Sequence, residues 1–145
     1  MCEHFFFEEK EGKRCRLVAG VRTFTLRSDA LKDMAAILAN QTRVNDVVAR
    51  LGGDEFALWL DEVGQNDAVT KAMELLEAST ILEAYSGDSD HMLGVSIGIA
   101  AFEPESGETL EQLIARADAA MYQAKKDGKA SCAVAPPAAV LDREA

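Results

Sequence analysis

Apolar residues recur along the chain with the period of an α-helix in three places. Leu31 and Met34 mark a helical face within residues 28–40, because residues three or four apart share one side of a helix. The same spacing predicts a second helix over 66–79 and a third from 110 to at least 124. The third pattern is the most regular.

Polar residues at fitting positions support these helices. Ser28 stands where a hydroxyl accepts a hydrogen bond from an unpaired N–H at a helix start. Thr109 and Gln112 have the spacing of a capping box at the start of the third helix. Lys125 and Lys129 lie near its end, where the helix dipole favours cations.

Strand-like runs rich in apolar and β-branched residues alternate with these helices. The predicted strands cover residues 14–26, 46–51, 55–60, 92–102 and 131–134. The resulting order, β–α–β–β–α–β–α–β, predicts an α+β sandwich in which helices cover a central antiparallel or mixed sheet. At 145 residues the chain is long enough for the core of one domain.

The sequence RLGGDEF, residues 50–56, joins the second and third predicted strands. Gly52 and Gly53 predict a hairpin turn, since glycine adopts positive φ angles without steric cost. Asp54 and Glu55 follow at once, and we expect different tasks for them because neighbours in a strand point to opposite faces. A carboxylate here suits a Mg²⁺ ion that also contacts a phosphate; an ordinary charged hairpin tip is the alternative.

Two pairs of charged residues are further candidates for ligand binding. Lys125 and Lys129 are one helical turn apart and suit a phosphate, although a solvated helix end is the default interpretation when these two residues are taken alone. Arg43 and Asp46 precede the second strand, where the arginine fork suits a guanine edge and a phosphate. A local salt bridge is the alternative for this pair.

Composition narrows the classes of function. The formal net charge is −10, which argues against non-specific binding to duplex DNA, because such binding needs a basic surface. No apolar run approaches the roughly 18 residues of a membrane span, and no signal peptide is recognisable, so we expect a cytoplasmic chain without nucleic-acid or membrane partners. Cys2, Cys15 and Cys132 lack the spacing of a metal motif and are expected to be free thiols.

Four stretches together resemble the GGDEF domain family, the diguanylate cyclases. Residues 50–56 carry the signature, and VSIGIA at 95–100 looks like the family's central strand. ADAAMYQAK at 117–125, followed by Gly and Lys at 128–129, looks like its last helix and phosphate-binding turn. SDAL at 28–31 resembles the start of its first long helix.

The resemblance implies a ferredoxin-like fold related to nucleotidyl cyclases and polymerase palms. Two domains would pair as a homodimer, each holding one GTP. Two Mg²⁺ or Mn²⁺ ions would help each 3′-OH to attack the other nucleotide's α-phosphate, giving cyclic di-GMP and pyrophosphate. In such two-metal nucleotidyltransferase chemistry, positioning and charge neutralisation provide most of the rate.

The family's site residues transfer to matching positions of this chain. Gly52 and Gly53 would pass along the GTP phosphates, and Asp54 would ligate a metal ion. Glu55 would assist at the reacting end or contact the guanine side of the nucleotide, and the sequence does not choose between these roles. Asp29 would contact guanine.

The basic residues take roles from the same resemblance. Lys125 and Lys129 would hold the terminal phosphates, with Lys129 standing where the family usually has arginine. Arg43 and Asp46 match the family's product-inhibition motif in their spacing from the signature. They would bind cyclic di-GMP and restrain activity.

The chain departs from the family before Ser28. The family pattern there is a strand ending in Asp-x-Asp-x-Phe-Lys-x-x-Asn-Asp, which supplies a second metal-ligating Asp and a guanine-binding Asn. This chain reads LVAGVRTFTLR, without Asp, Asn or His. We therefore predict weak or absent cyclase activity, since a Mg²⁺ ion facing a triphosphate needs more from the protein than Asp54 alone.

Three explanations of this departure are open. The domain is a non-catalytic receptor or regulatory partner that keeps the Arg43 and Asp46 site. Alternatively, an acid such as Glu8, Glu9 or Glu11 takes the missing place. In the third explanation, the start of the chain is not the ancestral one.

The sequence accordingly divides into a divergent segment 1–27, a GGDEF-like unit 28–134 and a loose tail 135–145. The leading interpretation is a diguanylate cyclase-type domain that condenses two GTP into cyclic di-GMP. The alternative is a non-catalytic module for cyclic di-GMP binding or regulatory interaction.

Overall fold

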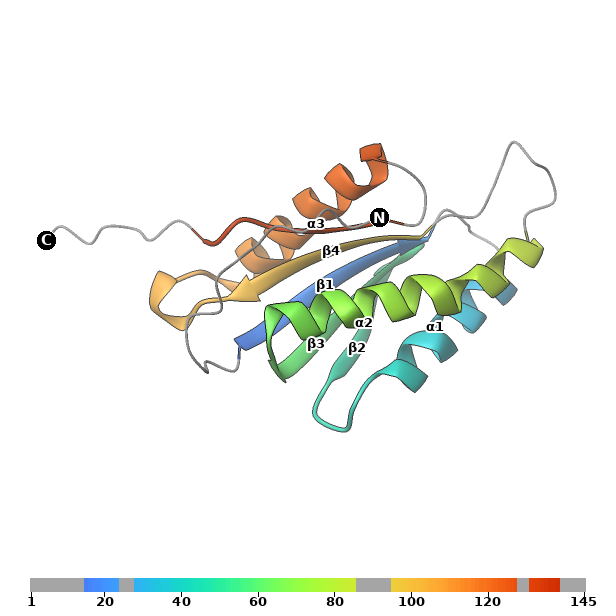
Figure 1. The fold of residues 1–145 in the computed structure, drawn as a ribbon, viewed down its shortest axis with the longest axis horizontal. Helices are drawn as coiled ribbons and strands as arrows, with labels where there is room; N and C mark the ends of the chain where they lie inside the picture. The colour runs from blue at the N-terminus through green and yellow to red at the C-terminus, as the bar shows by residue number, and fades with distance from the viewer. Residues whose placement is uncertain (1–14, 24–27, 86–94, 128–130, 139–145) are drawn as a thin grey trace, which may run out of the picture.

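The computed structural model describes residues 15–23, 28–85, 95–127 and 131–138. Within these ranges the predicted order of strands and helices is confirmed, with two short 3₁₀ helices added (Figure 1). The elements are β1 (Cys15–Thr23), α1 (Ser28–Gln41), β2 (Val47–Gly52), β3 (Glu55–Val63), α2 (Gln65–Ala78), η1 (Ser79–Tyr85), β4 (Val95–Phe102), η2 (Pro104–Ser106), α3 (Leu110–Asp127) and β5 (Ser131–Val134).

β1 is the central strand of the sheet, whereas β4, which contains the stretch 95–100 expected to be central, lies beside it. The strands lie in the order β2–β3–β1–β4–β5. β1 pairs antiparallel with β3 and β4, β2 pairs antiparallel with β3, and β5 pairs parallel with β4. The sheet is therefore mixed, and the predicted α+β architecture is confirmed. β1 lies in one sheet with the later strands, while the division of the chain at residue 28 stays a prediction.

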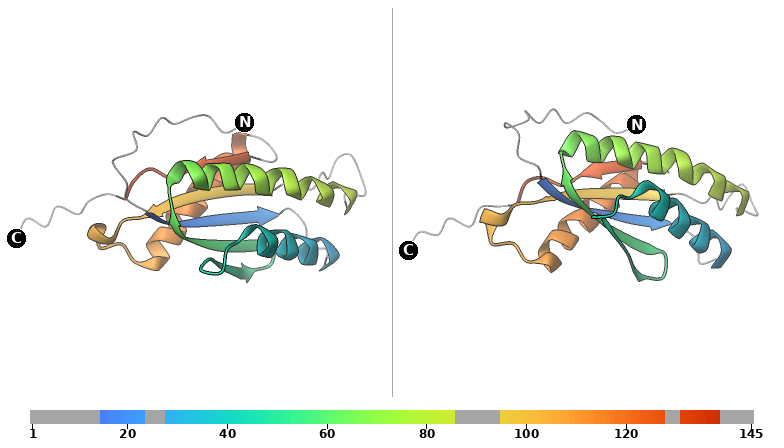
Figure 2. Two further views of the ribbon diagram at one scale, coloured as in Figure 1. Left: turned by 60° about the horizontal axis from the view of Figure 1, so that its bottom comes forward. Right: turned by 90° about the horizontal axis from the view of Figure 1, so that it is seen from below.

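Different helices cover the two faces of the sheet. α1 and α2 lie on one face and α3 on the other (Figures 1 and 2). Ile97 and Ile99 of β4 belong to the larger apolar cluster, which includes residues of α1 and α2. Ala100 belongs to the smaller cluster, which includes residues of α3. Side chains alternate along a strand, so β4 contributes one row to each layer.

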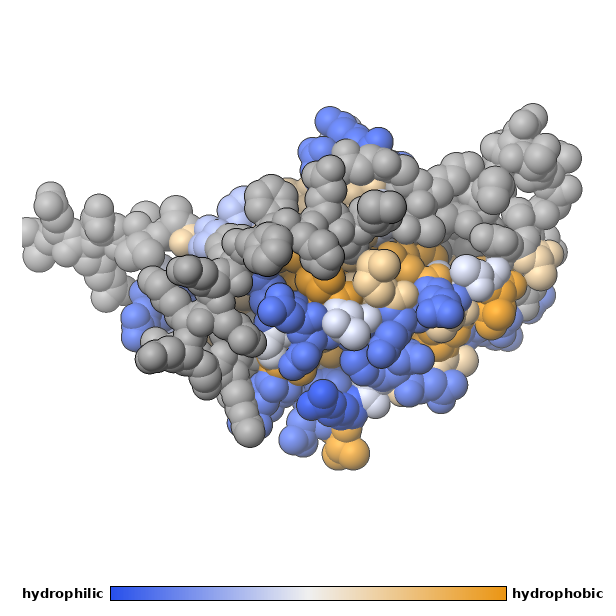
Figure 3. Space-filling model, viewed as in Figure 1, coloured by the Kyte–Doolittle hydropathy of each residue, from blue (hydrophilic) through white to orange (hydrophobic). Residues whose placement is uncertain are grey.

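The surface mixes hydrophilic and hydrophobic side chains over the face that carries α1 and α2 (Figure 3). None of the helices in the described ranges has the length and hydrophobicity of a membrane span. The exposed large apolar side chains come from several helices and strands and from the turn before β2: Val44, Val47, Leu51, Met73, Ile81, Leu110 and Tyr122.

Cys132 corrects one expectation. It lies in β5 and is 7% exposed. The residue is disulfide-bonded, so the prediction of free thiols is wrong for this cysteine. Disulfide pairing follows distance in space rather than spacing in the sequence.

The capping box predicted at the start of α3 is present. The N–H of Thr109 donates to Gln112 Oε1 at 2.9 Å, and the N–H of Gln112 donates to Thr109 Oγ1 at 3.2 Å. Both backbone donors would otherwise lack a partner within the helix. The pair therefore fixes where α3 begins.

A bidentate ion pair anchors the first half of α3. Arg116 Nε and Nη2 donate to the Glu108 carboxylate at 2.5 and 2.8 Å. The same guanidinium donates to the carbonyls of Ala101 at 2.6 Å and Pro136 at 2.8 Å. The hydrogen bond with Glu108 raises the pKa of Arg116, which therefore keeps its charge throughout the neutral pH range. Arg116 thus ties α3 to β4 and to the segment after β5.

Gly98 lets α3 approach β4 closely. A Cβ atom at this position would lie 2.0 Å from the Ala117 carbonyl oxygen and 2.5 Å from the Met121 nitrogen. Both atoms belong to the helix backbone, so no side-chain rotation relieves the overlap. The distance between α3 and β4 therefore depends on the absence of a side chain at residue 98.

We expect Gly98→Ala to destabilise the fold by roughly 1 to 3 kcal/mol, because α3 must shift away from β4 to admit the new methyl group. Chemical denaturation followed by circular dichroism measures this change in the free energy of unfolding. A variant as stable as the wild type would show that α3 is not held at this distance.

We expect Arg116→Ala to cost roughly 3 kcal/mol, because it leaves the Glu108 carboxylate, 5% exposed, without its charged partner. The double variant Glu108→Ala/Arg116→Ala should lose less than the sum of the two single variants, since it strands no charge. Urea denaturation of all four proteins tests the coupling, and additive losses would contradict it.

Candidate active site

The site is built around the hairpin between β2 and β3. Gly52 has φ 152° and Gly53 has φ 51°, both in the region that favours glycine. A Cβ atom at either position would meet nothing within 4 Å. The requirement for glycine is therefore conformational, and the space beside the turn is open to a ligand.

Arg50 braces this turn from within β2. Its Nε and Nη2 atoms both donate to the carbonyl oxygen of Gly53, at 3.0 and 2.7 Å. The strand register shifts between Arg50 and Gly52, so Leu51 is the extra residue of a bulge. Two hydrogen bonds to one carbonyl fix the orientation of the peptide that precedes Asp54.

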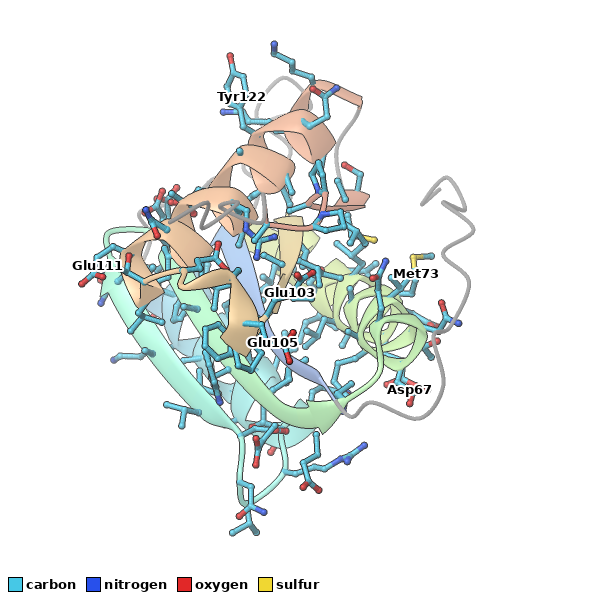
Figure 4. All side chains as sticks on the ribbon, turned by 90° about the vertical axis from the view of Figure 1, so that its left-hand side faces the viewer. Asp67, Met73, Glu103, Glu105, Glu111 and Tyr122 are labelled. Carbon is cyan, nitrogen blue, oxygen red and sulfur yellow. The ribbon has the colours of Figure 1, made fainter. Side chains whose placement is uncertain are left out.

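A pocket of about 240 Å³ adjoins the start of β3. It lies between β3, β4 and the second half of α3, and its lining residues are Glu55, Ser96, Asp118, Met121, Tyr122 and Lys125. Figure 4 shows the side chain of Tyr122 at the far end of α3, directed away from the sheet. The Lys126 ammonium lies 4.7 Å from the centroid of the Tyr122 ring.

The two acids of the hairpin lie in different surroundings, as their adjacent positions predict. Glu55 begins β3 and lines the pocket. Asp54 is in the turn itself and is not among the pocket residues. Phe56, the next residue, is 3% exposed and belongs to the large apolar cluster, which anchors the hairpin in the core.

β1 lies in the sheet between β3 and β4, the two strands that contribute residues to the pocket. Arg22 is its residue in register with both Glu55 of β3 and Ser96 of β4. The whole strand reads CRLVAGVRT and contains no carboxylate. The central strand therefore brings a basic residue to this level of the sheet and contributes no acid.

The metal centre implied by the family resemblance does not fit these residues. Within the described ranges, no three His, Cys, Asp or Glu side chains are grouped so that they could hold a metal ion. Glu8, Glu9 and Glu11, considered as substitutes, lie outside the described residues. A protein-held pair of metal ions would need more carboxylates than the hairpin supplies.

The loop before β2 is held by the side chain of Asp46. Its Oδ2 accepts from the N–H of Arg43 at 2.8 Å, and its Oδ1 accepts from the N–H of Asp61 at 3.1 Å. The N–H of Asp46 also donates to the Arg43 carbonyl at 3.0 Å. Arg43 itself is exposed. Asp46 thus fixes the loop to the end of β3 and presents Arg43 to solvent.

The other predicted site residues are spread over the fold. Lys125 lines the pocket, whereas Lys129 lies outside the described residues. Asp29 is exposed in the first turn of α1 and is not part of the pocket lining. The structure therefore brings Glu55 and Lys125 to one pocket, which Asp29 does not line.

Sequence reasoning missed Ser96 and Asp118 as pocket residues. A signal for Asp118 exists in the sequence. One helical face, with the spacing i, i+3, i+4, i+7, contains Asp118, Met121, Tyr122 and Lys125. Ser96 alternates with the buried Ile97 along β4, which places it on the face toward α3. Neither signal alone identifies a pocket.

Comparisons with known proteins assign most of the chain to one family. Residues 28–131 match the family model of the diguanylate cyclase GGDEF domain. The chain is 38% identical over 100 residues to the bifunctional diguanylate cyclase/cyclic di-GMP phosphodiesterase MucR of Pseudomonas aeruginosa, covering 68% of this chain and 14% of that protein. It is 36% identical over 102 residues to the diguanylate cyclase TpbB of the same species, covering 70% of this chain and 23% of TpbB.

A solved structure extends the likeness to three dimensions. An EAL/GGDEF domain protein from M. capsulatus superposes with a TM-score of 0.67 at 28% identity, and the match covers 90% of both chains. The chain spans less than a quarter of each of the two curated relatives above. By sequence and by fold, it belongs to the GGDEF domain family of diguanylate cyclases.

Proposed function

We propose that this GGDEF domain binds GTP beside the Gly52–Gly53 turn and condenses it to cyclic di-GMP slowly. The observation that carries the proposal is the open glycine turn just before Asp54 and Glu55, together with the pocket that Glu55 and Lys125 both line. Glycines without side chains admit phosphate groups close to the backbone. A lysine ammonium then neutralises part of the phosphate charge.

The reaction joins two nucleotides and so requires two domains. Each 3′-oxygen forms a bond to the other nucleotide's α-phosphorus, and each α-phosphorus releases pyrophosphate. One hairpin with one pocket suits one GTP, so we propose that two copies of the domain meet with their hairpins facing. Arg50 would then keep each turn in a fixed orientation toward the shared nucleotides.

A divalent ion would reach this site mainly on the nucleotide. Mg²⁺ is commonly bound by one or two carboxylates together with substrate phosphates. Asp54, in the turn, is the residue that we propose as the protein's contribution. With a single carboxylate the ion would be held less firmly, and for this reason we propose slow turnover.

We expect the purified chain to form cyclic di-GMP from GTP and Mn²⁺ at a rate roughly 100-fold or more below that of a GGDEF domain with an intact Asp-x-Asp strand, because a metal ligand is lacking. Mass spectrometry of the products measures both rates. Asp54→Asn serves as the blank. Turnover that equals the reference and disappears in Asp54→Asn would contradict the proposal.

Binding of cyclic di-GMP at the loop before β2 is a second candidate function. The exposed guanidinium of Arg43 is available to a guanine edge or a phosphate. The Asp46 carboxylate accepts hydrogen bonds from the amides of Arg43 and Asp61 and so holds the backbone of the loop that carries Arg43. This loop would act whether or not the domain turns over GTP.

We expect Arg43→Ala to weaken cyclic di-GMP binding roughly tenfold or more, measured by calorimetry, and to leave thermal stability unchanged, because the charged contact is lost from an exposed side chain. Asp46→Ala should also lower the free energy of unfolding by roughly 1 to 2 kcal/mol, since it leaves two amide donors without their acceptor. Absence of binding by the wild type would end this candidate.

A further inference from the structure

Four serines are the buried polar residues within the described ranges, and one of them differs from the others. Ser79 and Ser106 each donate their hydroxyl at 2.7 Å to a carbonyl in the preceding turn. Ser131 donates to the carbonyl of Ala124. Ser96 is 0% exposed, and its Oγ has no hydrogen-bond partner among the described residues.

Ser96 and Ser131 are direct neighbours, which makes the difference informative. They pair across β4 and β5. Ser131 reaches a backbone carbonyl of α3, whereas Ser96 lies where α3 and the sheet leave the pocket between them. Gly98 is two residues beyond Ser96 in β4 and lies on the same face of the sheet. At Gly98 the strand lies directly against the backbone of α3. The Ser96 hydroxyl therefore lies at the edge of the packed interface between α3 and β4, beside the pocket.

A buried hydroxyl without a partner is unfavourable, because it has lost water and gained no hydrogen bond in exchange. Native proteins pair the large majority of such groups, so each exception calls for an explanation. An alanine would fill nearly the same space without this cost. A ligand that completes the hydrogen bond would explain why a hydroxyl is present in this pocket.

We propose that the Ser96 hydroxyl donates a hydrogen bond to a phosphate oxygen of the nucleotide bound in this pocket. The proposal rests on the proposed binding of GTP and assigns one further residue to it. Lys125 is the cation of the pocket lining, which also contains the carboxylates of Glu55 and Asp118, so an anion would bind on the side of Lys125. A hydroxyl and an ammonium are both hydrogen-bond donors, so together they recognise a phosphoryl group rather than a neutral sugar.

Access to Ser96 requires a change of side-chain conformation. The residue is fully covered without ligand. Tyr122 and Lys125 line the same pocket from α3 and are exposed, so they can change rotamer without disturbing the core. We therefore expect a phosphate to reach the hydroxyl after a rotamer change at the rim of the pocket.

The test separates the stability of the fold from its affinity for nucleotide. Ser96→Ala should unfold at the same temperature as the wild type or a higher one, because it removes an unpaired hydroxyl. The matched control Ser131→Ala should unfold roughly 3 to 6 °C lower, because it removes a hydroxyl that is paired. A melting temperature of Ser96→Ala that falls as far as that of Ser131→Ala would overturn the proposal.

Calorimetry with a non-hydrolysable GTP analogue and with guanosine measures the contact itself. We expect Ser96→Ala to bind the analogue roughly tenfold more weakly than the wild type and to bind guanosine equally well, because the hydrogen bond to a charged oxygen is lost. If the wild type and Ser96→Ala bind the analogue equally well, the proposed role of Ser96 is wrong, while the proposed function is unaffected. Failure of the wild type to bind the analogue would overturn the proposed function and this inference together.

Discussion

The close approach of α3 to β4 is the contact on which the site depends. Because residue 98 is glycine, the backbones of α3 and β4 nearly touch at Ala117 and Met121. The next turn of the helix, which contains Lys125, is thereby placed beside Glu55 and above the start of β4. The Arg116–Glu108 pair and the capping box fix the other end of the helix. The pocket exists because one end of α3 is anchored and its middle lies against the sheet.

The hairpin is positioned by a separate set of contacts, made by polar side chains to backbone atoms. Arg50 holds the carbonyl of Gly53 at the tip. At the opposite end of the same pair of strands, Asp46 accepts from the amide of Asp61. Phe56, buried in the core, connects the hairpin to the layer of α1 and α2. The open turn is thus a rigid element, as close backbone approach to a phosphate requires.

The sequence predicted the features that depend on neighbouring residues. The helices follow from apolar spacing, the capping box from Thr109 and Gln112, and the hairpin from its two glycines. The contacts of Arg116 with Pro136 and of Asp46 with Asp61 could not be predicted, because these partners lie far away in the sequence and no local pattern marks them. The strand β1 was predicted, but its place in the centre of the sheet was not. In that place Arg22 of β1 is level with Glu55 of β3 and Ser96 of β4.

The hydrogen bonds of Arg116 also have a mechanical consequence. The Arg116 guanidinium donates to the carbonyl of Pro136, beyond β5, and to the carboxylate of Glu108, just before α3. The amide of Ala135 is bonded in addition to the Ile99 carbonyl of β4 at 2.7 Å. A force applied to the chain after Pro136 would therefore not simply separate β5 from β4. It would also act on α3 through Arg116 and on β4 through the amide of Ala135, so that tension on this segment reaches the contact that shapes the pocket.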